Sequence, residues 1–253
     1  MSDTKKVQEQ FSKDPGGYVT SEVHAAGDSL AWLAAHIQPE GGGLVLDVAT
    51  GGGHTARLFT GRSGVAVAGD LTHAMLRAAV SHAADLLPCQ HDSHALPFAA
   101  GTFDAVTCRI APHHFRDVAL FVQEAARVLK PDGVFGLVDN IVSGEPAVGR
   151  YINAFEALRD PSHHEAYTLD DWLTFFFRAG LAVEAQATLQ KRIEFEPWVA
   201  RMQVSPADQD RLRALLLQAP TAARDWLKPE QAGRQISFQL SEVLLRGRKT
   251  SPH

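Results

Sequence analysis

Two hydrophobic patterns alternate along the first half of the chain. Short apolar runs bounded by glycine are typical of buried parallel strands, and they alternate with longer stretches whose apolar residues recur at helical spacing. The expected strands cover residues 44–48, 65–69, 86–91, 103–110 and 134–138, and the expected helices cover residues 21–37, 72–84 and 118–130. Strands that alternate with helices in this way predict an α/β fold with a doubly wound parallel sheet.

The last third of the chain has a different order of patterns. The expected elements there are helices at 168–179 and 205–218 and strands at 181–196 and 236–245. The final strand is expected because its apolar and polar residues alternate with a period of two. We therefore expect the sixth and seventh strands to be separated by a helical insert.

Composition places the chain among ordinary globular proteins. Of its 253 residues, 45% are hydrophobic and 21% are charged, which excludes a disordered chain. No apolar run approaches the roughly 20 residues of a membrane-spanning helix, and the polar start does not resemble a secretory signal. The net charge of −5 argues against nucleic acid as the main partner. Cys89 and Cys108 lie in expected strands, which predicts buried thiols and a cytoplasmic location.

A glycine-rich loop follows the first expected strand. Residues 47–54 (DVATGGGH) span the place where this strand gives way to a helix. Glycine lets the chain turn tightly and lets a ligand approach the backbone, and a helix start offers unpaired N–H groups. The alternative is a plain strand-to-helix turn, but such loops at the carboxyl ends of parallel strands are typical of nucleotide sites.

Carboxylates accompany this loop and the next two strands. Asp70 ends the second strand, where an acid can accept hydrogen bonds from both hydroxyls of a ribose; alternatively it is an N-cap for the helix near Thr72. Asp92 ends the third strand, where it can accept a hydrogen bond from an adenine amino group. Asp47 would repel a pyrophosphate but attract the ammonium and sulfonium groups of S-adenosylmethionine. This favours S-adenosylmethionine over NAD.

Three ordered motifs resemble those of the class I S-adenosylmethionine-dependent methyltransferases. The first is the glycine loop with Asp47, in which Ala49 stands where the family usually has glycine. The second combines residues 91–98 (HDSHALPF) with 101–104 (GTFD), and the third is 127–133 (RVLKPDG). The chain resembles most the small-molecule subgroup around the ubiquinone/menaquinone-biosynthesis C-methyltransferases. The resemblance implies a Rossmann-like sheet of seven strands in the order 3-2-1-4-5-7-6, with strand seven antiparallel.

The resemblance also implies how S-adenosyl-L-methionine, and its product S-adenosyl-L-homocysteine, are held. Asp47 and the glycine loop would hold the methionine part, and Asp70 would hold the ribose. Asp92 and Ser93 would face the adenine. The expected cofactor-binding residues are Tyr18, Thr20, Asp47, Ala49, Thr50, Gly51, Gly53, Asp70, Leu71, Met75, Asp92, Ser93, Arg109 and Ile110.

The end of the fourth expected strand, residues 109–115 (RIAPHHF), corresponds to the segment that faces the transferable methyl group in the family. His113 and His114 are therefore the candidate catalytic residues, because a histidine can take up a proton near neutral pH. The alternative is that one or both only pack and hydrogen-bond this loop. The segment lacks the Asn/Asp-Pro-Pro-aromatic run of enzymes that methylate nucleic-acid bases or glutamine amides.

No linker divides the chain, and we expect a single domain over residues 1–253. Its expected parts are an N-terminal helical lid (1–40), a cofactor-binding half (41–140) and a substrate-side half (141–253) with a helical insert (197–219). In the lid, Tyr18 and Thr20 would help to close the pocket; the alternative is a surface helix. In the insert, Trp198 and Met202 either wall the acceptor pocket or belong to a helix core.

The sequence predicts S-adenosylmethionine-dependent methyl transfer to a small molecule by in-line displacement. O- or C-methylation is favoured, and the protein is expected to be a monomer or homodimer. No metal site is expected, since His91–His94 and His163–His164 lack an accompanying cysteine cluster or H-E-x-x-H helix. The alternatives are a quinone-pathway C-methyltransferase, a noncatalytic cofactor-binding scaffold and a nicotinamide-dependent oxidoreductase.

Overall fold

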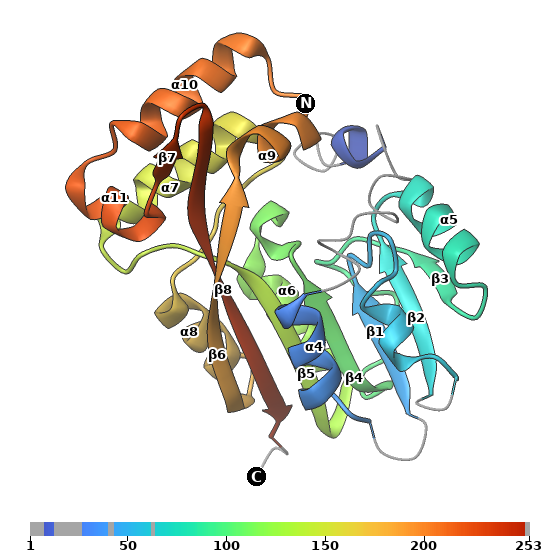
Figure 1. Ribbon diagram of the computed structural model, residues 1–253. Coiled ribbons are helices and arrows are strands. Elements are labelled where there is room, and N and C mark those ends of the chain that lie inside the picture. The colour runs from blue at the N-terminus through green and yellow to red at the C-terminus, as the bar shows by residue number, and fades with distance from the viewer. Residues whose placement is uncertain (1–7, 13–26, 40–42, 62–63, 251–253) are drawn as a thin grey trace.

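A mixed β-sheet forms the centre of the molecule (Figure 1). The computed structural model describes residues 8–12, 27–39, 43–61 and 64–250. The strands are β1 Leu44–Val48, β2 Val65–Asp70, β3 Leu87–Gln90, β4 Phe103–Arg109, β5 Leu129–Ile141, β6 Leu181–Glu194, β7 Glu230–Ala232 and β8 Gln235–Lys249. Their order is β3-β2-β1-β4-β5-β8-β6, with β7 paired to β8. β1 to β5 pair in parallel, and β8 is antiparallel to its neighbours β5 and β6. This confirms the predicted order, with β8 as the antiparallel strand.

Helices cover both faces of this sheet. The helices are α4 Asp28–His36, η1 Ala56–Phe59, α5 His73–His82, η3 Pro112–His114, α6 Val118–Val128, α7 Pro146–Arg159, α8 Leu169–Arg178, α9 Phe195–Arg201, α10 Pro206–Leu217 and α11 Thr221–Leu227. On one face, side chains of α6 and α8 such as Phe121 and Trp172 pack on alternate strand residues such as Val106. On the other face, α4 and α5 pack through Leu33 and Ala79. The sheet is therefore buried on both sides, which is why its inner strands are continuously apolar.

Local capping explains where two of these helices begin. The Asp117 side chain accepts a hydrogen bond from the amide of Leu120 and starts α6. Thr168 and Asp171 form a reciprocal capping box that starts α8. Such caps satisfy amides that have no partner within the helix. Both starts agree with the sequence prediction to within one residue.

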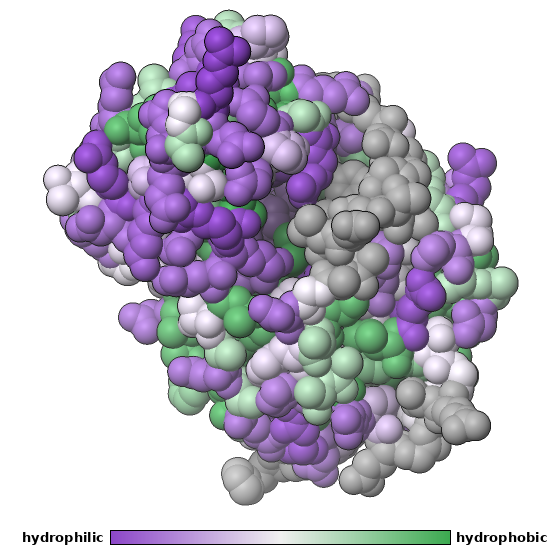
Figure 2. All heavy atoms as spheres, in the orientation of Figure 1, coloured by the Kyte–Doolittle hydropathy of each residue, from purple (hydrophilic) through white to green (hydrophobic). Residues whose placement is uncertain are grey.

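A cap with its own hydrophobic core stands at one end of the long strands β6 and β8 (Figure 1). We define the cap as α7 together with the segment from α9 to β7, residues 195–232. Its core contains the stacked rings of Phe155 and Trp198, and the Arg159 guanidinium lies 4.7 Å from the centre of the Trp198 ring. Figure 2 shows that the outer surface of the cap is mostly hydrophilic and that the molecule is hollowed beside it.

The structure corrects several predicted boundaries. β5 begins at Leu129 and reaches Ile141, so residues 131–133 lie within the strand rather than in a turn before it. The helical insert is longer than predicted and comprises three helices, α9, α10 and α11. The sequence pattern also did not predict α7. The apolar residues of α7, such as Ile152, pack on the insert, so its partners lie far away in the sequence.

Two further sequence expectations can be compared with the structure. Both cysteines are free thiols; Cys108 is buried, and Cys89 is partly exposed on the edge strand β3. Within the described ranges, none of the helices is both long and apolar enough to cross a membrane.

Candidate active site

The glycine loop after β1 adopts a backbone conformation that L-residues rarely take. Ala49, Gly51 and Gly53 have φ angles of 53°, 53° and 80°. A β-carbon on Gly53 would also lie 3.0 Å from side-chain atoms of Ala79 and Leu86. Ala49 therefore stores backbone strain at a position where glycine would be relaxed. This strain is a physical reason why the family motif that the glycine loop resembles usually has glycine at this position.

Asp47 is held inside the sheet at the start of this loop. Its two carboxylate oxygens accept hydrogen bonds from the hydroxyls of Thr50 and Thr107, each at 2.7 Å. Burial raises the pKa of Asp47 to about 6, although both threonines and the charge of Arg109 oppose the shift. The carboxylate thus joins the glycine loop to β4 and leaves a negative charge at the cavity wall near neutral pH.

Asp70 ties the glycine loop to the end of β2. Its oxygens accept hydrogen bonds from the backbone amides of Thr72 at 2.8 Å and Gly51 at 3.0 Å. Because α5 begins at His73 with Thr72 in the N-cap position, Asp70 is not its N-cap residue. A carboxylate offers about four acceptor positions, so the Asp70 carboxylate keeps acceptor capacity at the cavity wall.

The segment after β3 contributes Asp92, Ser93 and His94 to the same cavity. One oxygen of Asp92 accepts hydrogen bonds from the backbone amide of His94 at 2.9 Å and from its Nδ1 at 2.5 Å. The Nε2 of His94 accepts a hydrogen bond from the amide of Asp117 at 3.2 Å. His94 therefore connects this segment to the start of α6.

His91 is a cavity residue whose role the sequence analysis did not identify. Its side chain is buried against Gly69, where a β-carbon would lie 2.1 Å from the His91 Nε2 atom. Neither ring nitrogen has a hydrogen-bond partner among the described residues. The glycine directly before Asp70 is the sequence signal that could have indicated a side chain packed on β2.

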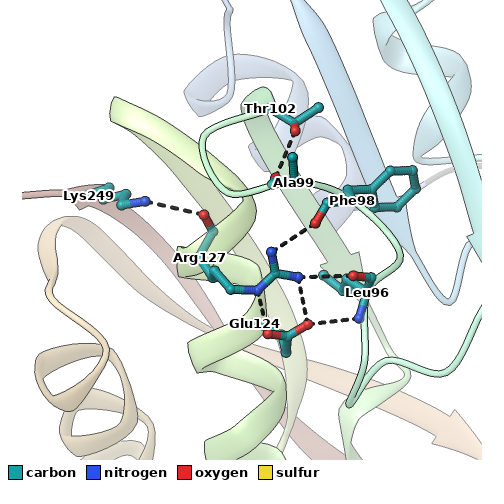
Figure 3. Close-up of polar contacts among 7 residues, drawn as sticks. All are labelled: Leu96, Phe98, Ala99, Thr102, Glu124, Arg127 and Lys249. Atoms are coloured by element: carbon teal, nitrogen blue, oxygen red, sulfur yellow. Dashed lines mark hydrogen bonds and ion pairs between the residues drawn. The ribbon is translucent and has the colours of Figure 1, made fainter.

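A side-chain clamp holds the loop that follows Asp92 (Figure 3). The Arg127 guanidinium donates hydrogen bonds to the carbonyls of Leu96 and Phe98 and to the Glu124 carboxylate at 2.6–2.9 Å. Glu124 in turn accepts a hydrogen bond from the Leu96 amide at 2.8 Å. The second and third sequence motifs thus contact each other and fix the wall that carries Asp92.

The end of β4 closes the opposite wall. The Nε of Arg109 donates to the Thr55 hydroxyl at 3.1 Å, and its Nη1 lies 3.5 Å from the Ser29 hydroxyl of α4. Ile110 has a φ of 55°, which is rare for a β-branched residue. Strain of this kind concentrates at functional sites, and here it occurs at the ends of the two central strands, β1 and β4.

The two candidate catalytic histidines face different surroundings. His114 lines the cavity, and its Nδ1 lies 3.0 Å from the Ser162 carbonyl. Burial and the neighbouring His113 lower the pKa of His114 to about 3, so it is neutral near pH 7. His113 is not among the described residues that line the cavity. Its Nδ1 lies 2.6 Å from the buried Asp139 carboxylate of β5.

The neighbouring Asp139 carboxylate sets the direction in which the pKa of His113 is shifted. Burial lowers the pKa of His113, but the charge and hydrogen bond of Asp139, with the charges of Glu156 and Asp160, outweigh it and raise the pKa overall. The raised pKa favours the protonated form of His113, which pairs with the Asp139 carboxylate between η3 and β5. The structure thus places one of the two histidines in the cavity and the other against a buried carboxylate outside it.

These walls enclose a cavity with about 1150 Å³ of empty space, including the part that opens to solvent. The residues predicted for the cofactor that line it are Asp47, Ala49, Thr50, Gly51, Asp70, Leu71, Met75, Asp92, Ser93, Arg109 and Ile110. Gly53 is not among the described residues that line the cavity; it faces the side chains of Ala79 and Leu86. Tyr18 and Thr20 lie outside the described residues.

The N-terminal segment reaches the cavity through residues that the sequence analysis did not select. Phe11 lines the cavity and packs edge-on against His114, with ring centroids 5.1 Å apart. The side-chain amide of Gln8 donates to the Leu71 carbonyl at 3.1 Å. Trp198 and Met202 of the cap are not among the described residues that line the cavity, and Trp198 belongs to the cap core.

The histidine pairs considered for a metal have other surroundings. His94 binds Asp92, and the Nε2 of His163 donates to the Asn153 side chain at 2.8 Å. Over the described part of the chain, no three histidine, cysteine or acidic side chains cluster in a way that could hold a metal ion.

The chain is similar to known methyltransferases in sequence and in fold. A family model described as a methyltransferase domain matches residues 46–137. The uncharacterized methyltransferase YcgJ of Bacillus subtilis is 34% identical over 94% of this chain and 97% of its own length. Its crystal structure superposes with a TM-score of 0.85 and 32% identity, covering 88% of this chain and 99% of that chain.

Two more distant proteins are also similar to the chain. The ubiquinone/menaquinone biosynthesis C-methyltransferase UbiE of Desulfotalea psychrophila is 33% identical over 60% of this chain and 71% of its own length. The geranyl diphosphate C-methyltransferase of Streptomyces coelicolor, solved with S-adenosyl-L-homocysteine, has a TM-score of 0.67 at 12% identity. It covers 99% of this chain and 98% of that chain, and it shares the fold.

Proposed function

The chain belongs to the class I S-adenosylmethionine-dependent methyltransferases, and we propose that it methylates an oxygen or carbon atom of a small molecule, with S-adenosyl-L-methionine as donor. The observation that carries this proposal is the cavity in which the ends of β1, β2 and β4 meet His114. Carboxylates and a glycine loop line one part of it, and a neutral histidine and two aromatic residues line another.

The residues of the cavity fit this cofactor. Asp70 keeps acceptor capacity for ribose hydroxyls, and Asp92 and Ser93 lie on the wall after β3, where an adenine would bind. Asp47 supplies negative charge beside the glycine loop, which suits the cationic methionine end. When bound, the cofactor supplies an already activated methyl group, so the protein mainly positions the acceptor and excludes water.

Within this proposal, His114 is the catalytic residue that touches the acceptor. It lines the cavity, and as a neutral imidazole it can accept a hydrogen bond from a hydroxyl group of the acceptor. This bond would align a lone pair of the hydroxyl oxygen for in-line attack on the methyl group. Its low pKa favours orientation of the acceptor over storage of a proton. His113 would instead hold η3 on β5 through Asp139.

The domain organisation is part of the proposal. Residues 1–253 would form one domain, in which the segment 1–40 acts as a lid; support comes from the contacts of Gln8 and Phe11 at the cavity. The cap would border the acceptor side. The cytoplasmic location and the monomeric or homodimeric state stay predictions.

A quinone-type acceptor is the second candidate function. It is favoured by the match to UbiE, whose name describes C-methylation in ubiquinone and menaquinone biosynthesis. The apolar rings of Phe11 and Phe115 at the cavity would suit an aromatic head group.

A labelled methyl-transfer screen tests the proposal. S-adenosyl-L-methionine with a radiolabelled methyl group is incubated with small phenols, hydroxy acids and demethylated quinols. We expect label in one acceptor class, and a loss of about 100-fold for His114→Gln, because an aligned catalytic contact is removed. The exposed His73→Gln on α5 is the matched control. Full turnover by His114→Gln would contradict its role, and no transfer to any acceptor would favour a noncatalytic scaffold.

A further inference from the structure

The imidazole of His114, which lines the cavity, is held by Ser162 at its Nδ1 atom. Its Nδ1 atom lies 3.0 Å from the carbonyl oxygen of Ser162 and 3.2 Å from the Ser162 hydroxyl oxygen. A carbonyl oxygen can only accept a hydrogen bond. The Nδ1 atom must therefore carry the proton in this arrangement, and the Nε2 atom of the neutral ring keeps its lone pair.

The hydroxyl group of Ser162 donates its proton in a hydrogen bond to Asp160. The Ser162 Oγ donates to Oδ1 of Asp160 at 2.6 Å, and the Ser162 amide donates to the same oxygen at 2.9 Å. Because its proton is used in this way, the Ser162 hydroxyl can only accept from His114. The Asp160 residue is 4% exposed, so water competes little for these bonds.

The loop that carries both residues is itself fixed against η3. It follows α7, and the amides of His164 and Glu165 donate to the His113 carbonyl at 2.8 and 3.1 Å. On its other side, the ring of His163 is bonded to Asn153 of α7. The loop therefore presents Ser162 to His114 from a position set by both the cap and η3.

We infer that Ser162 and Asp160 are positioning residues, which fix the Nδ1-protonated tautomer of His114 and so leave the Nε2 lone pair for the acceptor. The chain of hydrogen bonds runs from His114 Nδ1–H to Ser162 Oγ–H to the Asp160 carboxylate. No proton is transferred along it; it sets which nitrogen carries the proton. The catalytic meaning of this arrangement rests on the proposed function, whereas the tautomer itself does not.

The competing tautomer shows why both residues are needed. With the proton on Nε2, the lone pair of Nδ1 would face the Ser162 carbonyl oxygen, and the ring would offer the acceptor a donor in place of a lone pair. Such a ring could not accept a hydrogen bond from a hydroxyl group. Asp160→Asn replaces the carboxylate with a neutral amide oxygen, which is a weaker acceptor. The Ser162 hydroxyl can then donate to Nδ1 more readily, which relieves part of the penalty on this tautomer.

Nitrogen NMR of the histidine rings tests this inference without an acceptor. In 15N-histidine-labelled protein at pH 7, the ring-nitrogen shifts distinguish the two tautomers, and His114→Gln identifies the His114 signals. We expect the Nδ1–H form in the wild type. Asp160→Asn should raise the ratio of the Nε2–H to the Nδ1–H form about tenfold, because it removes charge-assisted bonds. Ser162→Ala should raise it about threefold, because the carbonyl contact remains.

Matched variants distinguish loss of the positioning contacts from an unspecific change in the structure. Ser162→Thr keeps the hydroxyl and should restore the wild-type ratio; the exposed Asp170→Asn and Ser81→Ala should leave it unchanged. An Nε2–H signal for wild-type His114, or an unchanged ratio in both Asp160→Asn and Ser162→Ala, would overturn the inference. Calorimetry with S-adenosyl-L-homocysteine on the same samples distinguishes failure of this inference from failure of the proposed function. If the wild type did not bind this ligand, the proposed function would be contradicted, but the assignment of the His114 tautomer would not.

Discussion

The cofactor side and the acceptor side of the cavity are built in different ways. On the cofactor side, carboxylates at strand ends bind backbone amides and hydroxyls close by: Asp70 binds Thr72 and Gly51, and Asp47 binds Thr50. On the acceptor side, His114 depends on Ser162, which lies 48 positions further along the chain. Both walls depend on contacts that the fold creates, since Asp47 also binds Thr107, 60 positions further along the chain. They differ in their chemistry: the cofactor side places acids near strand ends, and the acceptor side places a histidine against a buried polar loop.

The two walls should differ in which substitutions alter specificity for the acceptor. The acceptor wall connects η3, β5 and the loop after α7 through buried polar side chains such as Asp139 and Asp160. Buried polar networks rigidify a structure where their members are satisfied. Oδ1 of Asp160 accepts two hydrogen bonds, whereas Oδ2 of Asp139 has no hydrogen-bond partner among the described residues. Substitutions in the two walls should therefore have different consequences.

The largest effect is expected at Asp139. Asp139→Asn removes the charge that balances buried His113, and breaking a buried ion pair costs about 3–5 kcal/mol of unfolding free energy. Denaturant unfolding measures the loss, which should leave affinity for S-adenosyl-L-homocysteine little changed. Asp210→Asn, at an exposed pair with Arg213, is the control and should change stability little. Loss of affinity without loss of stability would contradict the division into two walls.

The next largest effect concerns pH and Asp47. The pKa of Asp47 is about 6 in the folded protein, compared with 3.8 for an unperturbed aspartate, so the folded state holds this proton more tightly. The wild type should therefore lose on the order of 3 kcal/mol of stability as pH rises from 4 to 8, relative to Asp47→Asn. The Asn side chain stays neutral, and the threonine hydroxyls can rotate to match its amide. If the free energies of unfolding of the two proteins changed in parallel between these pH values, this explanation would be wrong.

Asp70→Ala sharpens the comparison from the cofactor side. Charge-assisted hydrogen bonds contribute about 1.5–3 kcal/mol each, so losing the ribose contacts should weaken S-adenosyl-L-homocysteine binding about 100-fold. Calorimetric titration measures this effect. Asp85→Ala, an exposed acid between α5 and β3, is the matched control. An unchanged dissociation constant for Asp70→Ala would remove Asp70 from the site.

The smallest expected effect lies in the glycine loop. Ala49→Gly relieves a φ of 53°, and the gain of about 1–2 kcal/mol from removing left-handed strain is offset by about 0.5–1 kcal/mol of glycine entropy. The variant should therefore be more stable by about 0.5 kcal/mol in thermal unfolding. Ala78→Gly within α5 should be less stable, because glycine weakens a helix interior. Destabilisation by Ala49→Gly would mean that the methyl group of Ala49 contributes more than its strain costs.

The sheet could be predicted because each inner strand carries its own signal. β1, β2 and β4 are short apolar runs beside glycine, and the resemblance then supplied the strand order. The extent of β5 and the whole of α7 could not be predicted in this way. The apolar face of α7 packs on the cap, and the residues that form this core lie up to about 80 positions away.

The same reasoning explains which parts of the site were predicted. Asp47, Asp70 and Asp92 each end a strand and therefore meet at one edge of the sheet. Sequence alone selected both His113 and His114, because adjacency does not reveal which ring faces a cavity. It missed His91 because the signal, a glycine on the neighbouring strand, has meaning only once the two strands are paired.

Titration calorimetry with S-adenosyl-L-homocysteine, with NADH as the control ligand, tests the central claim most directly. We expect a roughly micromolar dissociation constant for S-adenosyl-L-homocysteine and no binding of NADH. Binding of NADH alone, or no binding of S-adenosyl-L-homocysteine by protein shown to be folded, would contradict the assignment of this cavity to S-adenosylmethionine.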